Sequence, residues 1–151
     1  MNRQKNLIMI KEKYLGAYMK TARIFAELST SKRKQVGAVI VKDNRIISIG
    51  YNGMPSGWDN NCEDVVHRIA QESILKTKPE VLHAESNAIA KLAKSTESGD
   101  GASMFITCSP CIECAKMIFQ SGIKEVFYDE DYRDDGGIVF LNKCGITVKQ
   151  I

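Results

Sequence analysis

The sequence lacks a strong excess of charge, a long hydrophobic run, internal repeats and low-complexity segments. Its net charge is only +3 over 151 residues, so we expect no extended basic surface of the kind that binds nucleic acid. No apolar stretch approaches the roughly 20 residues that a membrane-spanning helix needs, and the apolar run at residues 7–10 is too short for a secretory signal. Hydrophobic residues make up 44% of the chain and charged residues 26%, as in ordinary folded proteins. The length favours one compact domain over residues 1–151.

Cysteine is present but in a number that argues against a disulfide framework. The five cysteines are an odd count in a sequence with no secretion signal. Such cysteines are free, catalytic or metal-bound, and they indicate a reducing compartment. We therefore expect the protein to work in the cytoplasm, or in the host cytoplasm if its source is a virus.

The order of hydrophobic patterns and turn residues predicts an α/β layered domain with a mixed sheet. A hairpin is expected over residues 36–53, with Asp43 and Asn44 as its turn. A short helix is expected over residues 64–76. It should end before Pro79, because proline disfavours helix in the residue that precedes it. The remaining expected elements are helices at residues 11–28, 83–93, 109–122 and 136–145, and strands at 102–108, 123–130 and 146–151.

The stretch VLHAESNAIAKLA, residues 81–93, carries two polar residues at the start of an expected helix. His83 and Glu85 are two positions apart, and side chains at that spacing do not face each other along a helix. Both can reach one point only if that point lies just beyond the helix N-terminus. The pattern therefore predicts a site at the end of this helix.

The stretch SPCIECA, residues 109–115, predicts a second helix start. Ser109 suits the N-cap and Pro110 the first helical position. Cys111 and Cys114 then lie on one face of the opening turn, where the helix dipole favours thiolates. One imidazole, from His83, and two thiolates form a ligand set suited to zinc.

Three protein ligands are typical of a catalytic zinc site, because the fourth position is left for water. Zinc lowers the pKa of that water toward roughly 7, and Glu85 has the chemistry to carry its proton. The alternative is a closed structural site in which Cys108 supplies a fourth ligand. We disfavour it, because Cys108 ends a strand before the Ser109–Pro110 cap and should point elsewhere.

The combination of H-A-E with P-C-x-x-C resembles the signature of zinc-dependent deaminases of the cytidine and deoxycytidylate superfamily. The resemblance extends over nearly the whole chain to deoxycytidylate (dCMP) deaminases, in a compact form similar to those of bacteriophages. It includes VGAVIVKDNRIISIGYNGMPSG, LHAESNAI and SPCIECAKMIFQSGIKEVFYDEDY, and its most discriminating part is G-Y-N-G-x-P-x-G at residues 50–57.

This resemblance implies a single deaminase domain with a three-layer α/β/α cytidine-deaminase-like fold and a mixed five-stranded sheet. It implies hydrolytic removal of ammonia from dCMP, which supplies dUMP for thymidylate synthesis. His83, Cys111 and Cys114 would then bind Zn²⁺, and Glu85 would be the proton donor. Of the substrate-binding positions, Asn52 matches a sugar contact, Tyr132 matches a substrate-binding tyrosine, and Ser109 is expected to line the nucleotide pocket.

The resemblance also implies regulation and assembly. Such enzymes are typically homohexamers that dCTP activates and dTTP inhibits, with Mg²⁺ accompanying the triphosphates. The effector site is expected near the glycine-rich loop, at Gly53, Met54, Pro55 and Gly57. No membrane or nucleic-acid partner is implied.

Several alternatives stay open from the sequence. Cys62 and His67 are candidates for a second metal site, although no matching cysteine stands in residues 29–35. The chain could instead be a deaminase of another cytosine-type nucleoside or of a nucleic-acid base, or a non-catalytic zinc-binding module. The candidates for binding the 5′-phosphate are Lys32, Arg33, Lys34, Lys116 and Arg133.

Overall fold

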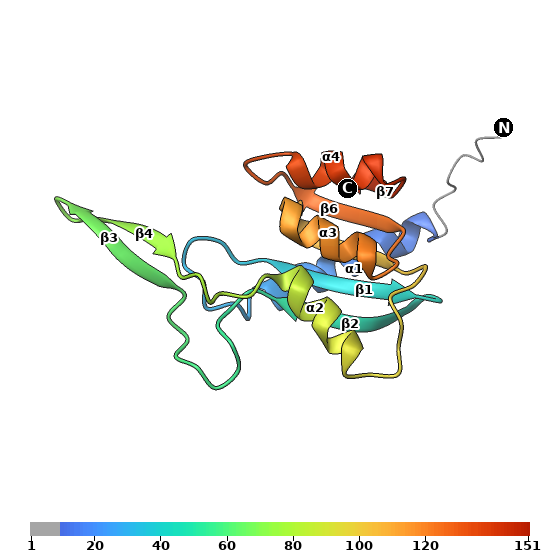
Figure 1. The fold of residues 1–151 in the computed structure, drawn as a ribbon, viewed down its shortest axis with the longest axis horizontal. Helices are drawn as coiled ribbons and strands as arrows, with labels where there is room; N and C mark the ends of the chain where they lie inside the picture. Colours follow the sequence, from blue (N-terminus) through green and yellow to red (C-terminus); the bar gives the residue numbers. More distant parts are fainter. Residues whose placement is uncertain (1–9) are drawn as a thin grey trace.

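A five-stranded sheet forms the centre of the computed structural model, which describes residues 10–151 (Figure 1). The apolar run at residues 7–10 therefore lies, except for Ile10, outside the described residues. The sheet contains β1 (Gly37–Lys42), β2 (Arg45–Tyr51), β5 (Ser103–Cys108), β6 (Glu125–Glu130) and β7 (Thr147–Gln150), in the order β2-β1-β5-β6-β7. The helices are α1 (Glu12–Ala26), α2 (Ala84–Ala93), α3 (Ile112–Gln120) and α4 (Gly136–Lys143).

The sheet is mixed, as predicted. Strand β1 runs antiparallel to both β2 and β5, whereas β5, β6 and β7 are parallel to one another. The expected hairpin is confirmed: Asp43 and Asn44 connect β1 to β2 with left-handed φ angles of 50° and 56°. Asparagine and aspartate tolerate that conformation, which matches the right-handed twist of a tight hairpin. Helices make the crossovers that the parallel strands need.

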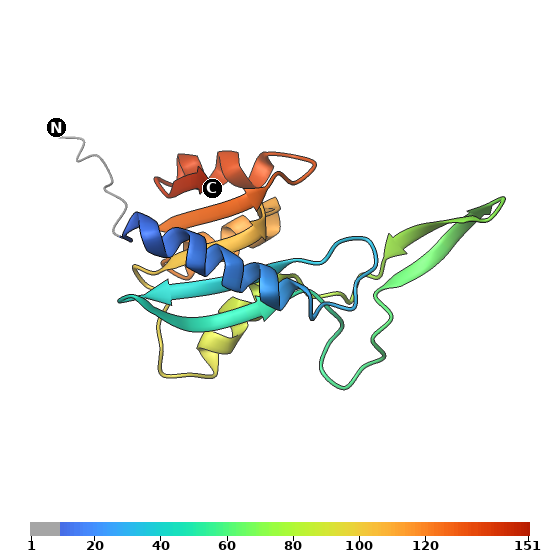
Figure 2. The same cartoon turned by 180° about the vertical axis from the view of Figure 1, so that it is seen from behind.

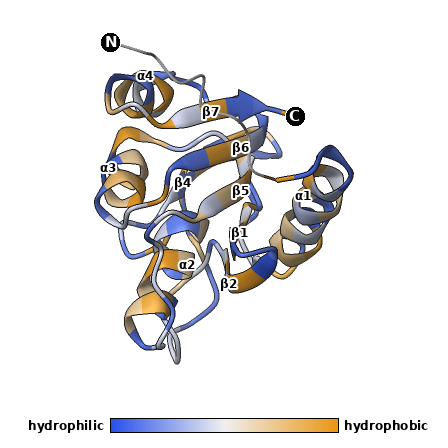
Figure 3. Ribbon diagram, turned by 90° about the vertical axis from the view of Figure 1, so that its right-hand side faces the viewer, coloured by the Kyte–Doolittle hydropathy of each residue, from blue (hydrophilic) through white to orange (hydrophobic). Residues whose placement is uncertain are grey.

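The helices cover both faces of the sheet and form the predicted three layers (Figures 2 and 3). Strand β1 shows why both faces are apolar, since its side chains point alternately to opposite sides. Val39 and Val41 pack with α1, whereas Ala38 and Ile40 pack in the core beneath α2 and α3. The largest buried pair, Phe105 and Phe127, stacks on the α1 side with ring centroids 4.8 Å apart.

Two glycines let helices approach backbone more closely than any side chain would allow. A Cβ on Gly50 would overlap the carbonyl oxygen of Ala84 in α2. A Cβ on Gly137 of α4 would overlap the carbonyl oxygen of Pro110, just before α3. Because α2 and α3 begin at these contacts, both glycines fix the positions of the helix starts.

The predicted helix at residues 64–76 is wrong. These residues form a two-stranded arm, β3 (Glu63–Ile69) and β4 (Glu72–Thr77), which projects from the body of the molecule (Figure 1). Its turn passes through Ala70, which has a left-handed φ of 55°. A short helix is stabilised by one buried apolar stripe, which the arm lacks. Both of its strands expose apolar side chains, namely Val65, Val66, Ile69 and Ile74.

Cys144 follows α4 and is half-buried. Among residues 10–151, no helix combines the length and the apolar character that crossing a membrane would require.

Candidate metal centre and active site

The two helix starts named by the sequence meet at one place. His83 is the N-cap residue of α2, and Cys111 is the N-cap residue of α3. Helix α3 therefore begins at Ile112, and the prediction that Ser109 caps it is wrong. Tertiary contacts hold Ser109 instead, because its N–H donates to the Glu130 carbonyl at 2.8 Å and its hydroxyl accepts the N–H of Tyr132 at 2.7 Å.

His83, Cys111 and Cys114 form a compact group of potential metal ligands. The His83 Nδ1 atom lies 3.3 Å from Cys114 Sγ and 3.7 Å from Cys111 Sγ, and the three ligand atoms all lie within 4.8 Å of one another. Tetrahedral zinc, with bonds of about 2.0–2.1 Å to nitrogen and about 2.3 Å to sulfur, separates such atoms by roughly 3.6 Å. The group therefore fits zinc in both chemistry and spacing.

The other candidate ligands do not join this group. Within residues 10–151, Cys108 is absent from it, which speaks against the closed four-ligand alternative. Cys62 is buried beside Thr30, with 3.4 Å between Sγ and Oγ1, whereas His67 is exposed on β3 of the arm. Neither belongs to any cluster of three potential ligands among the described residues.

The two ligand thiols are hydrogen-bonded to each other, and this contact changes the pKa of both. The pKa of Cys111 is lowered to about 3, first by hydrogen bonding with the Cys114 thiol and then by that with His83. The pKa of Cys114 is raised, because its thiol interacts with the Cys111 thiolate and is buried. Zinc binds cysteine as thiolate, so metal binding would displace the proton of the Cys114 thiol.

Glu85 lies beside the ligand group and is almost completely buried, with 4% of its surface exposed. Burial raises the pKa of its carboxyl group, and the neighbouring Cys114 thiol and His83 imidazole partly oppose that rise. A shielded carboxyl group with a raised pKa is suited to proton exchange. Of the two carboxylates that line the adjoining cavity, Glu85 is buried and Asp131 is exposed.

A cavity of about 460 Å³ opens onto this group, within the range typical of small-molecule sites. His83, Glu85, Cys111 and Cys108 line it, together with Ala84. Of the five basic candidates for phosphate binding, the cavity is lined by Arg33, Lys34 and Arg133. Lys32 does not line it, and Lys116 pairs instead with Glu113 on α3 at 2.8 Å.

The three substrate-binding candidates, Asn52, Ser109 and Tyr132, also line the cavity. The Asn52 amide bridges the neighbouring backbone, since its Oδ1 accepts the N–H of Val36 and its Nδ2 donates to the carbonyl of Lys34, both at 2.8 Å. One amide hydrogen of Asn52 stays available to a ligand.

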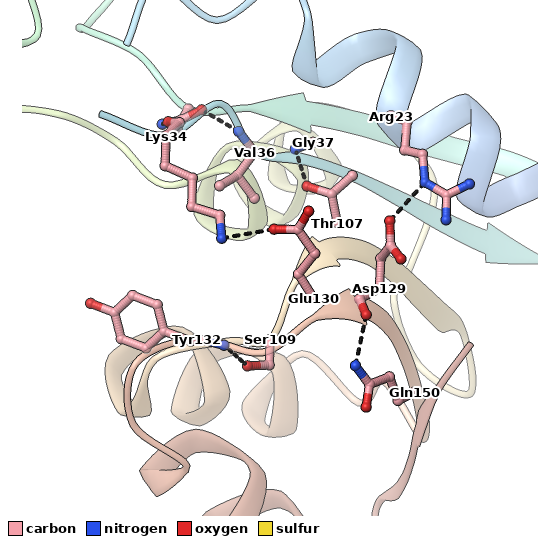
Figure 4. A network of polar contacts seen from close by, with 11 residues as sticks. Arg23, Lys34, Val36, Gly37, Thr107, Ser109, Asp129, Glu130, Tyr132 and Gln150 are labelled. Atoms are coloured by element: carbon pink, nitrogen blue, oxygen red, sulfur yellow. Dashed lines mark hydrogen bonds and ion pairs between the residues drawn. The ribbon is translucent and has the colours of Figure 1, made fainter. Parts of the chain in front are cut away.

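Figure 4 shows Tyr132 beside Ser109. Lys34 lies opposite Glu130, with 3.0 Å between Nζ and Oε2. The guanidinium of Arg133 lies 5.4 Å from the centre of the Tyr132 ring.

The glycine-rich loop at residues 50–57 is joined to the start of α2. Gly53 and Leu82 exchange two backbone hydrogen bonds, of 3.1 and 2.8 Å, and Leu82 directly precedes His83. The loop then turns at Gly57, where φ is 84° and the Trp58 N–H donates to the Pro55 carbonyl. Glycine is required at that turn by its left-handed φ.

The sequence did not single out two residues that belong to this region. Thr77 lines the cavity from the end of β4, and Glu63 is buried at the start of β3. Both flank the segment expected to be helical, so their position beside the cavity could not be anticipated. A β-branched Val65–Val66 pair was the available signal for a strand there.

Comparisons with known proteins agree with this geometry. The family described as the cytidine and deoxycytidylate deaminase zinc-binding region matches residues 12–130. Human deoxycytidylate deaminase is 42% identical over 142 residues, which span 88% of this chain and 76% of the human protein. Deoxycytidylate deaminase of Enterobacteria phage T4 is 37% identical, over 76% of this chain and 77% of the phage protein.

The crystal structure of dCMP deaminase from the cyanophage S-TIM5 in complex with dCMP and dUMP superposes with a TM-score of 0.83. It is 45% identical and covers 94% of this chain and 99% of the cyanophage chain. The chain thus belongs to the cytidine and deoxycytidylate deaminase family and is a zinc-dependent hydrolase.

Proposed function

We propose that this protein hydrolyses dCMP to dUMP and ammonia, and so supplies dUMP for thymidylate synthesis. The observation that carries the proposal is that one cavity is lined by two of the three metal ligands, His83 and Cys111, by the buried Glu85, and by the basic side chains Arg33, Lys34 and Arg133. The metal ligands and Glu85 suit the attack of water on a cytosine ring, and the three basic side chains suit the binding of a nucleotide phosphate. The similarity to proteins named deoxycytidylate deaminase supports dCMP as the substrate.

The metal ligands are His83, Cys111 and Cys114 in this proposal. These residues would hold zinc, which would supply Lewis-acid chemistry by lowering the pKa of a water molecule toward neutral. Glu85 would take one proton from the water and pass it to the ring nitrogen, and would then take the remaining hydroxyl proton and pass it to the amino group, which leaves as ammonia. Its burial supports this role, because a shielded carboxyl group keeps its proton from bulk water.

The nucleotide is held by the cavity walls. We assign the sugar contact to Asn52, whose free amide hydrogen can donate to a hydroxyl while its other groups fix residues 34–36. Tyr132 forms another wall of the cavity. Ser109 holds it there, because the Ser109 hydroxyl accepts a hydrogen bond from the N–H of Tyr132. The phosphate is assigned to Arg33 and Arg133, since Lys34 already pairs with Glu130.

The experiment is ammonia release by the purified, zinc-loaded protein, with dCMP, deoxycytidine, cytosine and single-stranded DNA offered separately. We expect dCMP to be the preferred substrate. Preference for cytosine, deoxycytidine or DNA would select the alternative of a different deaminase. No ammonia from any of the four would select the non-catalytic zinc-binding module.

Regulation by dCTP as activator and dTTP as inhibitor, each with Mg²⁺, is the second part of the proposal. Nothing lies within 4 Å of a Cβ added to Gly53 or Gly57, so the loop backbone is open to phosphates. Gly53 is hydrogen-bonded to Leu82, so a ligand that orders the loop acts next to His83. A cytoplasmic homohexamer, with residues 1–151 as one deaminase domain in each subunit, would make such a response cooperative.

Saturation curves for dCMP, measured alone, with dCTP and with dTTP, test this regulation. We expect dCTP to raise activity at low dCMP and dTTP to lower it. If the three curves coincide and calorimetry detects no triphosphate binding, the loop is a plain turn.

A further inference from the structure

The base of the β3–β4 arm holds a buried carboxylate that the proposed reaction does not use. Glu63 is 4% exposed, whereas every other residue of β3 is exposed. Its Oε1 atom accepts three hydrogen bonds from one short segment: from the Ser31 hydroxyl at 2.8 Å, the Lys32 N–H at 2.8 Å and the Arg33 N–H at 3.1 Å. The carboxylate is therefore the common acceptor of a turn that lies about thirty residues earlier in the chain.

The Ser31–Arg33 turn depends on this acceptor because residues 29–36 form neither helix nor strand. Backbone N–H groups outside regular structure need other partners, and a charged acceptor provides strong ones. Burial raises the pKa of Glu63, but hydrogen bonds from Ser31, Arg33 and Lys32 outweigh it and leave the pKa lowered. Oε2 is buried and accepts no hydrogen bond from residues 10–151, so all the contacts that hold the turn converge on Oε1.

The cross-strand neighbour of Glu63 holds the other end of the same arginine. Glu63 and Thr77 are register partners in the arm, and the Thr77 Oγ1 atom accepts a hydrogen bond from Arg33 Nη1 at 3.0 Å. One pair of facing residues thus fixes both the backbone and the guanidinium of Arg33. That guanidinium lines the cavity, and none of the ion pairs among residues 10–151 involves it. Its remaining N–H donors are free for a phosphate.

We propose that Glu63 and Thr77 are positioning residues that aim Arg33 at the 5′-phosphate, so that the base of the arm sets the preference for a nucleotide over a nucleoside. The inference rests on the proposed function and adds to it the origin of phosphate recognition. A bidentate arginine contact needs the guanidinium in one orientation, and an arginine held at both ends loses less freedom on binding. The arm acts through Arg33 and does not touch the reacting atoms.

The first test is a double-mutant cycle with Thr77→Val and Arg33→Ala. Valine keeps the β-branched shape of threonine and removes only the acceptor. We expect Thr77→Val to raise the KM for dCMP by about threefold to tenfold, the scale of one hydrogen bond, with kcat and the rate with deoxycytidine unchanged. Thr77→Ser should restore the wild-type KM. In the Arg33→Ala background, Thr77→Val should have no further effect.

The second test concerns the backbone. Glu63→Gln keeps an acceptor at Oε1 but loses the charge and places an amide N–H group at the buried Oε2 position, so its KM for dCMP should rise less than that of Glu63→Ala, which should rise by roughly tenfold or more. Glu72→Gln, at the exposed tip of the arm, is the matched control. Zinc content and melting temperature identify variants that fail to fold. If the Glu63 variants fail to fold, the Thr77→Val and Arg33→Ala cycle alone tests the proposal.

Calorimetry of dUMP and deoxyuridine binding to the same zinc-loaded proteins separates the two proposals. Absence of dCMP turnover by the wild type would remove the proposed function while dUMP binding still tested the arm. An additive effect of Thr77→Val in the Arg33→Ala background would overturn the inference, since Thr77 would then act directly. Equal losses with nucleotide and nucleoside would also overturn it, and so would a wild type that binds neither ligand.

Discussion

Replacing Glu85 by glutamine would separate proton transfer from metal binding. The amide has the shape of the carboxyl group but cannot take up and return a proton. Glu85 is 4% exposed and is not one of the three grouped ligands, so we expect the variant to fold normally and to keep its zinc. Turnover of dCMP should fall, because the other carboxylate lining the cavity, Asp131, is exposed and cannot replace a shielded group.

The expected loss is at least about two orders of magnitude, within the range of roughly 10²–10⁴ for general acid–base groups. This range corresponds to about 2.7–5.4 kcal/mol of transition-state stabilisation. The assay is steady-state ammonia release, with zinc measured by elemental analysis in the same preparation. Glu113→Gln is the matched control, because Glu113 also stands in the first turn of its helix but is exposed and pairs with Lys116.

Two results would refute the reasoning about Glu85. Near-wild-type turnover in Glu85→Gln would show that another group carries the proton. A parallel loss of zinc and activity would show that Glu85 supports the metal site itself and has no separate chemical role.

Two further predictions follow from the metal ligands and the helix contacts. Cys111→Ala should lose most of its zinc by elemental analysis, whereas Cys108→Ala, which changes a thiol outside the ligand group, should retain it; undiminished zinc in the first variant would contradict the assigned ligands. Gly50→Ala should unfold at a lower temperature, by roughly 4–8 °C for a cost of about 2 kcal/mol, because the new Cβ would lie 2.6 Å from the backbone nitrogen of Ala88. An unchanged melting temperature would mean that α2 can move away from β2 freely.

The sequence was sufficient for the sheet and the metal centre because their signals are local. Asp43 and Asn44 mark the hairpin by their backbone preferences, and the continuous apolar run of β1 follows from burial on both faces. The ligand group could be anticipated because each half stands at a helix start. What no local signal contained was the distance between the halves, which the sheet and the two close glycine contacts determine.

The errors arise where tertiary contacts decide the local structure. Ser109 and Pro110 have the features of a helix start, yet the hydrogen bonds of Ser109 with Glu130 and Tyr132 delay the helix until Ile112. The arm was mistaken for a helix because its exposed faces give no burial pattern and Ala70 is an uncommon turn residue. The roles of Glu63 and Thr77 depend on that hairpin pairing.

The hydrogen-bonded pair Gly53 and Leu82 joins the two ends of the long segment of residues 54–81. A second closure lies inside it, where the Lys78 N–H donates to the Cys62 carbonyl at 2.8 Å. Because both closures lie on the body side of the arm, its exposed tip at Ala70 and Gln71 is mechanically separate from α2, which begins at Ala84. The tip is therefore a permissive place to lengthen the chain or to insert a fluorescent or affinity label while leaving the cavity intact.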